Sequence, residues 1–310
     1  MKDFPIPVVA AFDFSTNTGL GLGIGPGSQA EDETLDYLPM PQGMQTFHAP
    51  PLPEPEDVAT LARGQAALRE ALAQLDLVRQ HPEAGCRSVD LMGLPAADLQ
   101  LINQVLGEGE VSAMVSAANG GRSDAATGLD VRVQESVFAG VWRVITTRDG
   151  VLASDTIELG SIPHALQTAA RDDIDPVIRR WQGALPPHVQ NAPALLAEIE
   201  DQWRTWRPGQ PAHVVNLTLL PMSQEDIGFL DHHLGTGRVL ILSRGYGNCR
   251  ISNTLRPNCW RVVYYNSQDV VILNTVEVST LPDVAQAAPE DLDDSHERLT
   301  EVLAWVGSGT

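Results

Sequence analysis

The stretch SVDLMGLP at residues 88–95 decides the fold, because a similar stretch, VVNLTLLP, stands at residues 214–221. Both are short apolar runs that end in Leu-Pro, and proline stops a strand because it cannot donate a backbone hydrogen bond. The separation between Leu94 and Leu220 returns almost unchanged for the segments on either side. A repeat at this spacing predicts two copies of one structural unit.

Helices are predicted on both sides of each stretch. Their apolar residues recur at helical spacing, so that each helix has one apolar face. Ser223 and Asp226 are placed to cap the last of these helices, because both side chains suit the free amides of a first turn. A Gly-x-Gly turn at 107–109 and another at 235–237 follow, and glycine suits the residue that ends a helix. The predicted helices lie near residues 61–79, 99–106, 194–206 and 227–234.

The correspondence continues through a set of strands. The matching segments are 111–116 with 239–243, 142–144 with 260–262, and 157–159 with 276–278. Short links cannot make parallel crossovers, so these three strands form an antiparallel meander. The sequence predicts an α+β protein of two tandem pseudo-repeats, each built as helix, strand, helix, three antiparallel strands and helix, with mixed sheets covered by helices. The repeats are expected to span residues 56–185 and 190–307.

The first 55 residues differ from the remainder. They contain a glycine-rich piece at 19–27, an acidic piece at 29–36 and a proline-rich piece at 37–56. Such sequence buries too little apolar surface to offset its ordering entropy. Residues 1–55 are therefore predicted to form an acidic arm that is partly mobile. Its more apolar segment, MPQGMQTF at 40–47, is expected to dock on the protein itself in preference to a partner.

The charge of the chain limits its partners. The formal net charge is −20, with 20 Lys and Arg against 40 Asp and Glu. This field repels phosphate backbones and anionic lipid, so a basic protein is a better expected partner than nucleic acid or a membrane surface. The N-terminal apolar run is interrupted by Asp13 and makes a poor signal peptide, and no stretch reaches the roughly 18 apolar residues of a membrane span. These features predict a cytoplasmic protein.

The densest polar segment is SRGYGNCR at residues 243–250, in the second copy. One interpretation is a binding edge, where glycines allow close backbone approach, Tyr246 stacks or hydrogen-bonds, and Cys249 offers a soft ligand. The other interpretation is a β-bulge or a hairpin turn. The first copy has SAANGGR at 116–122 in this place, without the Tyr or Cys, and both interpretations stay open.

A second polar segment, YYNSQD at residues 264–269, lies between two predicted strands. The simple interpretation is a turn, because Asn, Ser and Asp suit turn positions. The first copy has TTRDG at 146–150 there, which is typical of a plain hairpin. The alternative is that the richer second-copy segment lines the same surface as Tyr246.

Neither a metal site nor a catalytic motif is expected. Cys249 and Cys259 have no CxxC partner or spaced histidine, and the adjacent His232 and His233 point in different directions on a helix. Nucleophile-elbow, phosphate-loop and H-E-x-x-H motifs are absent. The glycine-rich piece at 19–27 is not a GxGxxG between a strand and a helix. We therefore expect no cofactor and no enzyme activity.

Several segments resemble the hydrogenase expression protein family HupH/HyaF, and the resemblance runs from about residue 37 to the C-terminus. It implies a maturation factor for uptake nickel–iron hydrogenase, thought to act on the small, iron–sulfur-bearing subunit before it joins the large one. The resemblance supplies no catalytic residues. The segments that carry it are GEGEV at 107–111, VFAGVWRV at 137–144, LTLLPM at 217–222, ILSRGYGNCR at 241–250 and NSQD at 266–269.

The leading hypothesis is an assembly chaperone that binds the hydrogenase small subunit and other hydrogenase accessory proteins. Its motivation is that the second copy has diverged into polar segments bracketed by glycines. Two alternatives remain, a redox or cluster-handling factor that uses Cys249 and a scaffold that bridges accessory proteins through the proline-rich arm. The predicted partner surface consists of Arg244, Tyr246, Asn248, Cys249, Arg250, Asn266, Gln268 and Asp269.

Overall fold

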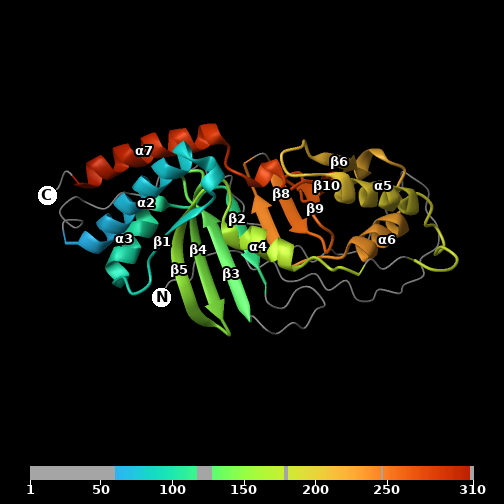
Figure 1. The fold of residues 1–310 in the computed structure, drawn as a ribbon, viewed down its shortest axis with the longest axis horizontal. Helices are drawn as coiled ribbons and strands as arrows, with labels where there is room; N and C mark the ends of the chain where they lie inside the picture. Colours follow the sequence, from blue (N-terminus) through green and yellow to red (C-terminus); the bar gives the residue numbers. More distant parts are fainter. Residues whose placement is uncertain (1–59, 117–127, 178–180, 246, 308–310) are drawn as a thin grey trace. The chain divides into compact units, whose positions relative to one another are not determined.

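Figure 1 shows the chain as a computed structural model. The structure describes residues 60–116, 128–177, 181–245 and 247–307. The predicted arm at 1–55, with its apolar segment at 40–47, lies outside the described residues, and so does Tyr246. All described residues belong to one unit that spans Pro50–Thr310.

Six α-helices form in the described ranges, and the four helices predicted on either side of the Leu-Pro stretches are among them. The predicted cap is confirmed, since the Ser223 side chain accepts from the Asp226 amide and the Asp226 side chain accepts from the Ser223 amide. Gly107 and Gly235 end their helices at positive φ, as predicted. None of the described helices is long and apolar enough to cross a membrane. The helices are α2 (Ala62–Gln80), α3 (Ala96–Leu106), α4 (His164–Asp172), α5 (Ala192–Thr205), α6 (Gln224–Leu234) and α7 (Pro289–Gly307).

The strands of the described residues join in a single ten-stranded sheet, and every pairing in it is antiparallel. The prediction of an α+β protein is confirmed, whereas the prediction of mixed sheets is wrong. The helix after β1 does not return the chain to a neighbouring parallel strand but carries it several strands across the sheet. The strands are β1 (Arg87–Asp90), β2 (Val111–Val115), β3 (Leu129–Glu135), β4 (Val141–Arg148), β5 (Val151–Leu159), β6 (His213–Asn216), β7 (Val239–Ser243), β8 (Asn248–Asn253), β9 (Cys259–Tyr265) and β10 (Val271–Val278).

Four strands, rather than the predicted three, follow the second helix of each predicted repeat. The additional strands are β3 and β8. In β3 the buried Val131 and Val133 alternate with more exposed neighbours, as expected of a strand with one buried face. In β8 the buried Cys249 and Ile251 alternate in the same way, although polar residues on the other face had favoured an irregular segment.

The strand order is β1-β5-β4-β3-β2-β7-β8-β9-β10-β6, and it follows the same scheme from either edge. From one edge, β1 is followed by β5, β4, β3 and β2. From the other edge, β6 is followed by β10, β9, β8 and β7. These are the two groups of strands. The two groups meet where β2 pairs with β7. Ala113 lies opposite Ile241 at the middle of that pairing, with Val111 opposite Ser243 and Val115 opposite Val239.

Three apolar cores hold the helices on the sheet. Helices α2, α3 and α7 pack on one sheet face over β1 and β5, and α5 and α6 pack over β6 and β10. Side-chain alternation in β4 and β9 puts both groups of helices on the same face, because Val141 and Cys259 enter these cores while Trp142 and Trp260 point the other way. Helix α4 lies across the centre of the opposite face (Figure 1), together with a 3₁₀ turn at Asp283–Ala285.

The two groups of strands, each with the helices that pack on it, form the two halves of this unit, and the last segment of each stretch of chain packs on the other half. Helix α7, the last of the described helices, supplies Leu292, Leu299 and Val306 to the core that contains α2 and α3. The segment after α4 in turn binds the other half, where the Asp175 amide donates to the Leu255 carbonyl at 3.0 Å. Each half therefore completes part of the other.

Candidate functional site

The two polar segments singled out in the sequence come together at one end of the sheet. Strands β7 and β8 pair as neighbours in an antiparallel arrangement, as the hairpin interpretation of residues 243–250 expects, while Tyr246 lies outside the described residues. Asn248, at the start of β8, lies opposite Tyr265, at the end of β9. The turn from Asn266 to Asp269 follows directly, so Arg244 and Asn248 share this end with it.

Cys249 does not lie on this surface. Its side chain is only 3% exposed and belongs to the core under α4. Burial raises the pKa of the thiol to about 11, although a hydrogen bond with Tyr264 acts in the opposite direction. A thiol with this pKa stays protonated near neutral pH and is a poor nucleophile. Arg250, the next residue along, points to the other sheet face.

The turn between β9 and β10 is held by its own asparagine. The Asn266 side-chain oxygen accepts from the Gln268 amide at 2.8 Å and the Val270 amide at 3.0 Å, and Asp269 has a φ of +58°. The simple turn interpretation of this segment is therefore confirmed. Gln268 and Asp269 are exposed, whereas the Asn266 side-chain oxygen is occupied within the turn.

Exposed apolar side chains lie beside this turn, and the sequence patterns did not predict them. Leu219 is 81% exposed, Val270 is 56% exposed and Ile272 is 57% exposed. The 3₁₀ turn Leu217–Leu219 is tied to β10, because the Asn274 amide donates to the Thr218 hydroxyl at 2.8 Å. The available signal was the stretch LTLLPM, whose leucines exceed what a short strand needs for its buried face.

The hairpin between β7 and β8 also touches the start of β2. The Arg244 amide donates to the Glu110 carbonyl at 3.1 Å. A Cβ atom at Gly245 would lie 1.9 Å from a carboxylate oxygen of Glu110, so a larger residue there would require the flexible Glu110 side chain to move. The first glycine of SRGYGNCR therefore lies against the Glu110 side chain.

Three carboxylates, Glu110, Glu135 and Asp291, lie near one another close to the start of β2. Glu135 is buried, and its side chain accepts from the Val111 amide at 3.3 Å. Burial, opposed by backbone hydrogen bonds and reinforced by the charges of Glu110 and Asp291, raises the pKa of Glu135 to about 7. No group of three His, Cys, Asp or Glu side chains in the described part of the chain could hold a metal ion.

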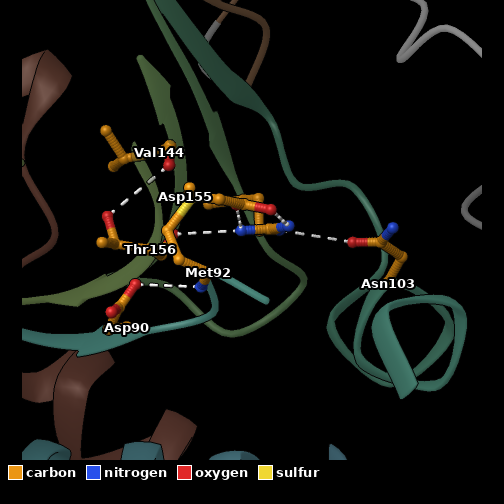
Figure 2. A network of polar contacts seen from close by, with 7 residues as sticks. Asp90, Met92, Asn103, Val144, Asp155 and Thr156 are labelled. Carbon is orange, nitrogen blue, oxygen red and sulfur yellow. Dashed lines mark hydrogen bonds and ion pairs between the residues drawn. The ribbon is translucent and has the colours of Figure 1, made fainter. Parts of the chain in front are cut away.

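A buried ion pair stabilises the first half of the sheet. Both oxygens of Asp155 accept from the guanidinium of Arg143, one of them at 2.7 Å, and the Asn103 side chain accepts at 3.4 Å. Figure 2 shows Asp155 on its strand and Asn103 reaching in from α3. In the second half, Arg261 has only Asp231, at 3.7 Å, and one of its nitrogens is buried without a partner among the described residues.

These features define the class as an α+β protein built on one antiparallel sheet, with polar turns and exposed apolar side chains gathered at one end. The chain belongs to the HupH hydrogenase expression protein family. The sequence model of this family, described as the "HupH hydrogenase expression protein, C-terminal conserved region", matches residues 61–185 and matches again at residues 189–306.

Curated relatives extend over nearly the whole chain. Hydrogenase expression/formation protein HoxQ from Cupriavidus necator is 53% identical over 99% of this chain and 100% of its own. HupH from Rhodobacter capsulatus is 46% identical, and the hydrogenase-1 operon protein HyaF from Escherichia coli is 34% identical, each over 90% of this chain and 94% of its own. A solved HupH structure from Thiobacillus denitrificans is 25% identical, covers 37% of this chain and 95% of its own, and has a TM-score of 0.35.

Proposed function

We propose that this chain is an assembly factor in the maturation of uptake nickel–iron hydrogenase, and that it holds the small subunit before that subunit joins the large one. Family membership is the observation that carries the proposal. Relatives at 53% and 46% identity are named hydrogenase expression/formation proteins, and one at 34% identity is named a hydrogenase-1 operon protein. A holding function needs a partner surface and no reaction centre.

We also propose that the chain arose by internal duplication, with repeats at residues 56–185 and 190–307. Two observations support this. The family sequence model matches the chain twice, at 61–185 and 189–306. The strand order follows one scheme from both edges of the sheet, with Ala113 and Ile241 at the centre.

The proposed partner surface lies at the end of the sheet that carries the turns after β7 and β9. An exposed apolar cluster rimmed by polar groups is typical of a protein-binding surface. Cys249 and Asn266 serve the core and the turn, so they contribute to this surface only indirectly. The direct contacts are assigned to Arg244, Tyr246, Asn248, Arg250, Gln268 and Asp269, with Leu219, Val270 and Ile272 beside them.

The test is recovery of the purified, tagged small subunit with this chain. The double variant Arg244→Ala/Tyr246→Ala is expected to lower recovery at least about fivefold, because interface anchors of these residue types typically contribute more than 1 kcal/mol each. Leu219→Asp should lower it further by placing a charge in the apolar cluster. Arg148→Ala, an exposed arginine on the hairpin of the other half, is the matched control. Unchanged recovery with both test variants would refute the surface.

The redox alternative is tested separately. No observation favours it, because Cys249 is buried and its thiol is protonated. Cys249→Ser is expected to leave hydrogenase maturation in cells at the wild-type level. Loss of maturation with small-subunit binding intact would restore a chemical function for this thiol. The scaffold alternative depends on the arm at 1–55, outside the described residues, and deletion of 1–50 tests it by loss or retention of complexes.

A further inference from the structure

The centre of the sheet has one covered face and one that no described helix covers. On the face under α4, alternate residues of β2, β3, β7 and β8 belong to an apolar core. The residues between them point to the other face, and their apolar members belong to none of the three cores. We call this surface the central face. It comprises Ser112, Met114, Arg132, Gln134, Ile145, Leu240, Leu242, Arg250, Ser252 and Val263.

Strand register arranges the central face in two rows. One row runs Ile145–Arg132–Met114–Leu240–Ser252, and the other runs Val263–Arg250–Leu242–Ser112–Gln134. The rows match when one of them is read in reverse across the sheet. Each has a β-branched residue, an arginine and a large apolar residue in the same order. The face therefore presents an apolar strip with one arginine at each of two diagonal corners.

These two arginines differ from their neighbours. Arg143 and Arg261, at the far ends of the same rows, each have a carboxylate partner, Asp155 and Asp231. Neither Arg132 nor Arg250 has an ion-pair or hydrogen-bond partner for its side chain among the residues that the structure describes. Two free guanidinium groups beside apolar side chains are notable in a chain of net charge −20. They match a partner that carries both carboxylates and apolar groups.

The backbone limits what can bind there. Strands β2, β3, β7 and β8 have sheet neighbours on both sides, so an incoming strand finds no free edge. An occupant must contact side chains from above the sheet. On either side of the central face, α3 and α6 already form the layer above the sheet. A helix is the element that fills such a gap, since helices pack on sheets in layers.

The spacing of the arginines sets the pattern of that helix. Arg132 and Arg250 stand three strands and one row apart, which is roughly 16 Å at a strand spacing of about 4.8 Å. A helix rises about 1.5 Å per residue, so carboxylates about 11 residues apart span this distance and lie on one side after three turns. Apolar residues at i+3, i+4, i+7 and i+8 lie between them on the same side.

We propose that the central face docks an amphipathic helix of a partner protein, with an apolar stripe over Met114, Leu240 and Leu242 and a carboxylate at each end on Arg132 and Arg250. Which protein supplies the helix rests on the proposed function, under which it belongs to the hydrogenase small subunit. The chemistry of the face does not depend on that identity. This interaction deepens the proposed function, because Arg250 is shared with the partner surface at the sheet end.

The first experiment uses the full chain and a labelled synthetic helix with leucines on one side and glutamates about 11 residues apart. A matched peptide has lysines in place of the two glutamates. Fluorescence anisotropy should show that the glutamate peptide binds at least about tenfold more tightly, since opposite charges attract and like charges at an interface repel. The variant Arg132→Glu/Arg250→Glu should reverse this order. Arg63→Glu/Arg148→Glu, exposed arginines elsewhere, should leave it unchanged.

Reversal by charge separates the proposal from simple misfolding, because a misfolded variant would bind neither peptide. Equal affinities of wild type for the two peptides would overturn the proposal. So would a preference that the Arg132→Glu/Arg250→Glu variant leaves intact. Sedimentation is expected to give the same monomer mass for wild type and variant, and a dimer lost on charge reversal would assign the face to a second copy of this chain instead.

The second experiment distinguishes this proposal from the proposed function. It measures recovery of the purified small subunit by the charge-reversed chain. The expected result is a loss of at least about fivefold. If recovery falls with Arg244→Ala/Tyr246→Ala and not with charge reversal, the docking proposal is wrong and the proposed function stands. If the peptides follow the charges and the small subunit is never recovered, the proposed function is wrong and the face remains a helix-binding surface.

Discussion

The two halves of the sheet share backbone contacts and differ in charge. The Gly109 amide donates to the Glu135 carbonyl at 2.7 Å, and the Gly237 amide donates to the Asn253 carbonyl at 2.9 Å. Around Asn253, the carboxylate of Asp173 accepts from the Asn253 side chain at 2.9 Å and from Arg238 at 2.6 Å.

Around Glu135, the charged neighbours are instead Glu110 and Asp291. One position is therefore neutralised and the other concentrates negative charge. The same backbone hydrogen bond is therefore formed beside a satisfied polar network in one half and beside a buried carboxylate in the other. A buried charge without compensation destabilises the fold, whereas a paired buried charge does so only when its partner is removed. At this pair of positions, Glu135 in the first half should therefore respond to pH, and the network around Asn253 in the second should respond to deletion of partners.

The largest expected effect concerns the ion pairs under α3 and α6. Arg143→Met leaves Asp155 buried without its partner and should lower the free energy of unfolding by about 3–5 kcal/mol. Arg261→Met removes a pair whose Asp231 side chain is 52% exposed, and should cost about 1 kcal/mol or less. Urea unfolding of both variants measures the difference, and equal losses would show that the two halves do not differ in this way.

The next effect breaks the neutral network of the second half. Asp173→Ala removes the acceptor for Arg238 and Asn253, and should lower the free energy of unfolding by about 2–3 kcal/mol, as for a hydrogen-bonded charged group. Asp291→Ala, in the α7 helix that packs on the first half, loses a bond to the Ala288 amide and relieves repulsion on Glu135, so its net cost should stay below about 1 kcal/mol. Thermal melts at one pH compare the two, and a larger cost for Asp291→Ala would reverse the comparison.

A pH-dependent effect sharpens the comparison further. The pKa of Glu135 is raised from 4.5 to about 7, chiefly by burial, so the folded state favours the protonated form. Ionisation of Glu135 therefore destabilises the folded state. This destabilisation is absent below the unfolded pKa and grows as pH rises to about 7. Glu135→Gln should stabilise the chain by about 2 kcal/mol at pH 8 and hardly at all at pH 4. Asn253→Ala serves as the pH-independent comparison, and a parallel pH profile for Glu135→Gln and wild type would contradict the assignment.

The smallest effect is expected at Cys249. Cys249 lies opposite Tyr264 in β9, as Val131 lies opposite Thr146 in β4, so valine already occupies the corresponding place in the first half. Cys249→Val should change the free energy of unfolding by less than about 1 kcal/mol, as volume-conserving core changes do. Denaturant unfolding checks this, and a loss of several kcal/mol would mean that the two positions are not equivalent.

Much of the local structure could be predicted from the sequence. The helical spacing and the cap at Ser223 identified helices correctly, and each Leu-Pro stretch contains a strand, although β1 ends at Asp90 and β6 at Asn216, before the Leu-Pro. The strand β3 was missed although Leu129–Glu135 alternates clearly, and β8 was missed because its outward residues are polar. The single sheet could not be predicted, since the pairing of β2 with β7 joins segments that no local pattern connects.

The candidate site was predictable to a similar extent. Turns follow from Asn and Gly chemistry, and the burial of Cys249 could have been deduced from its alternation with Ile251. The carboxylates of Glu110, Glu135 and Asp291 come from distant parts of the chain, so only the folded structure reveals that they share a location. The same holds for Arg132 and Arg250, whose relation depends on register across four strands.

The crossing of the C-terminal helix has a consequence for how the chain is made. Helix α2 is translated before α7, yet its core contains Leu299 and Val306 of α7. Early-made domains can fold as units while translation continues. Here the first half must wait, with apolar surface open, until α7 has been made. A chain whose proposed task is to hold an unfinished protein therefore has an incomplete core of its own until α7 has left the ribosome.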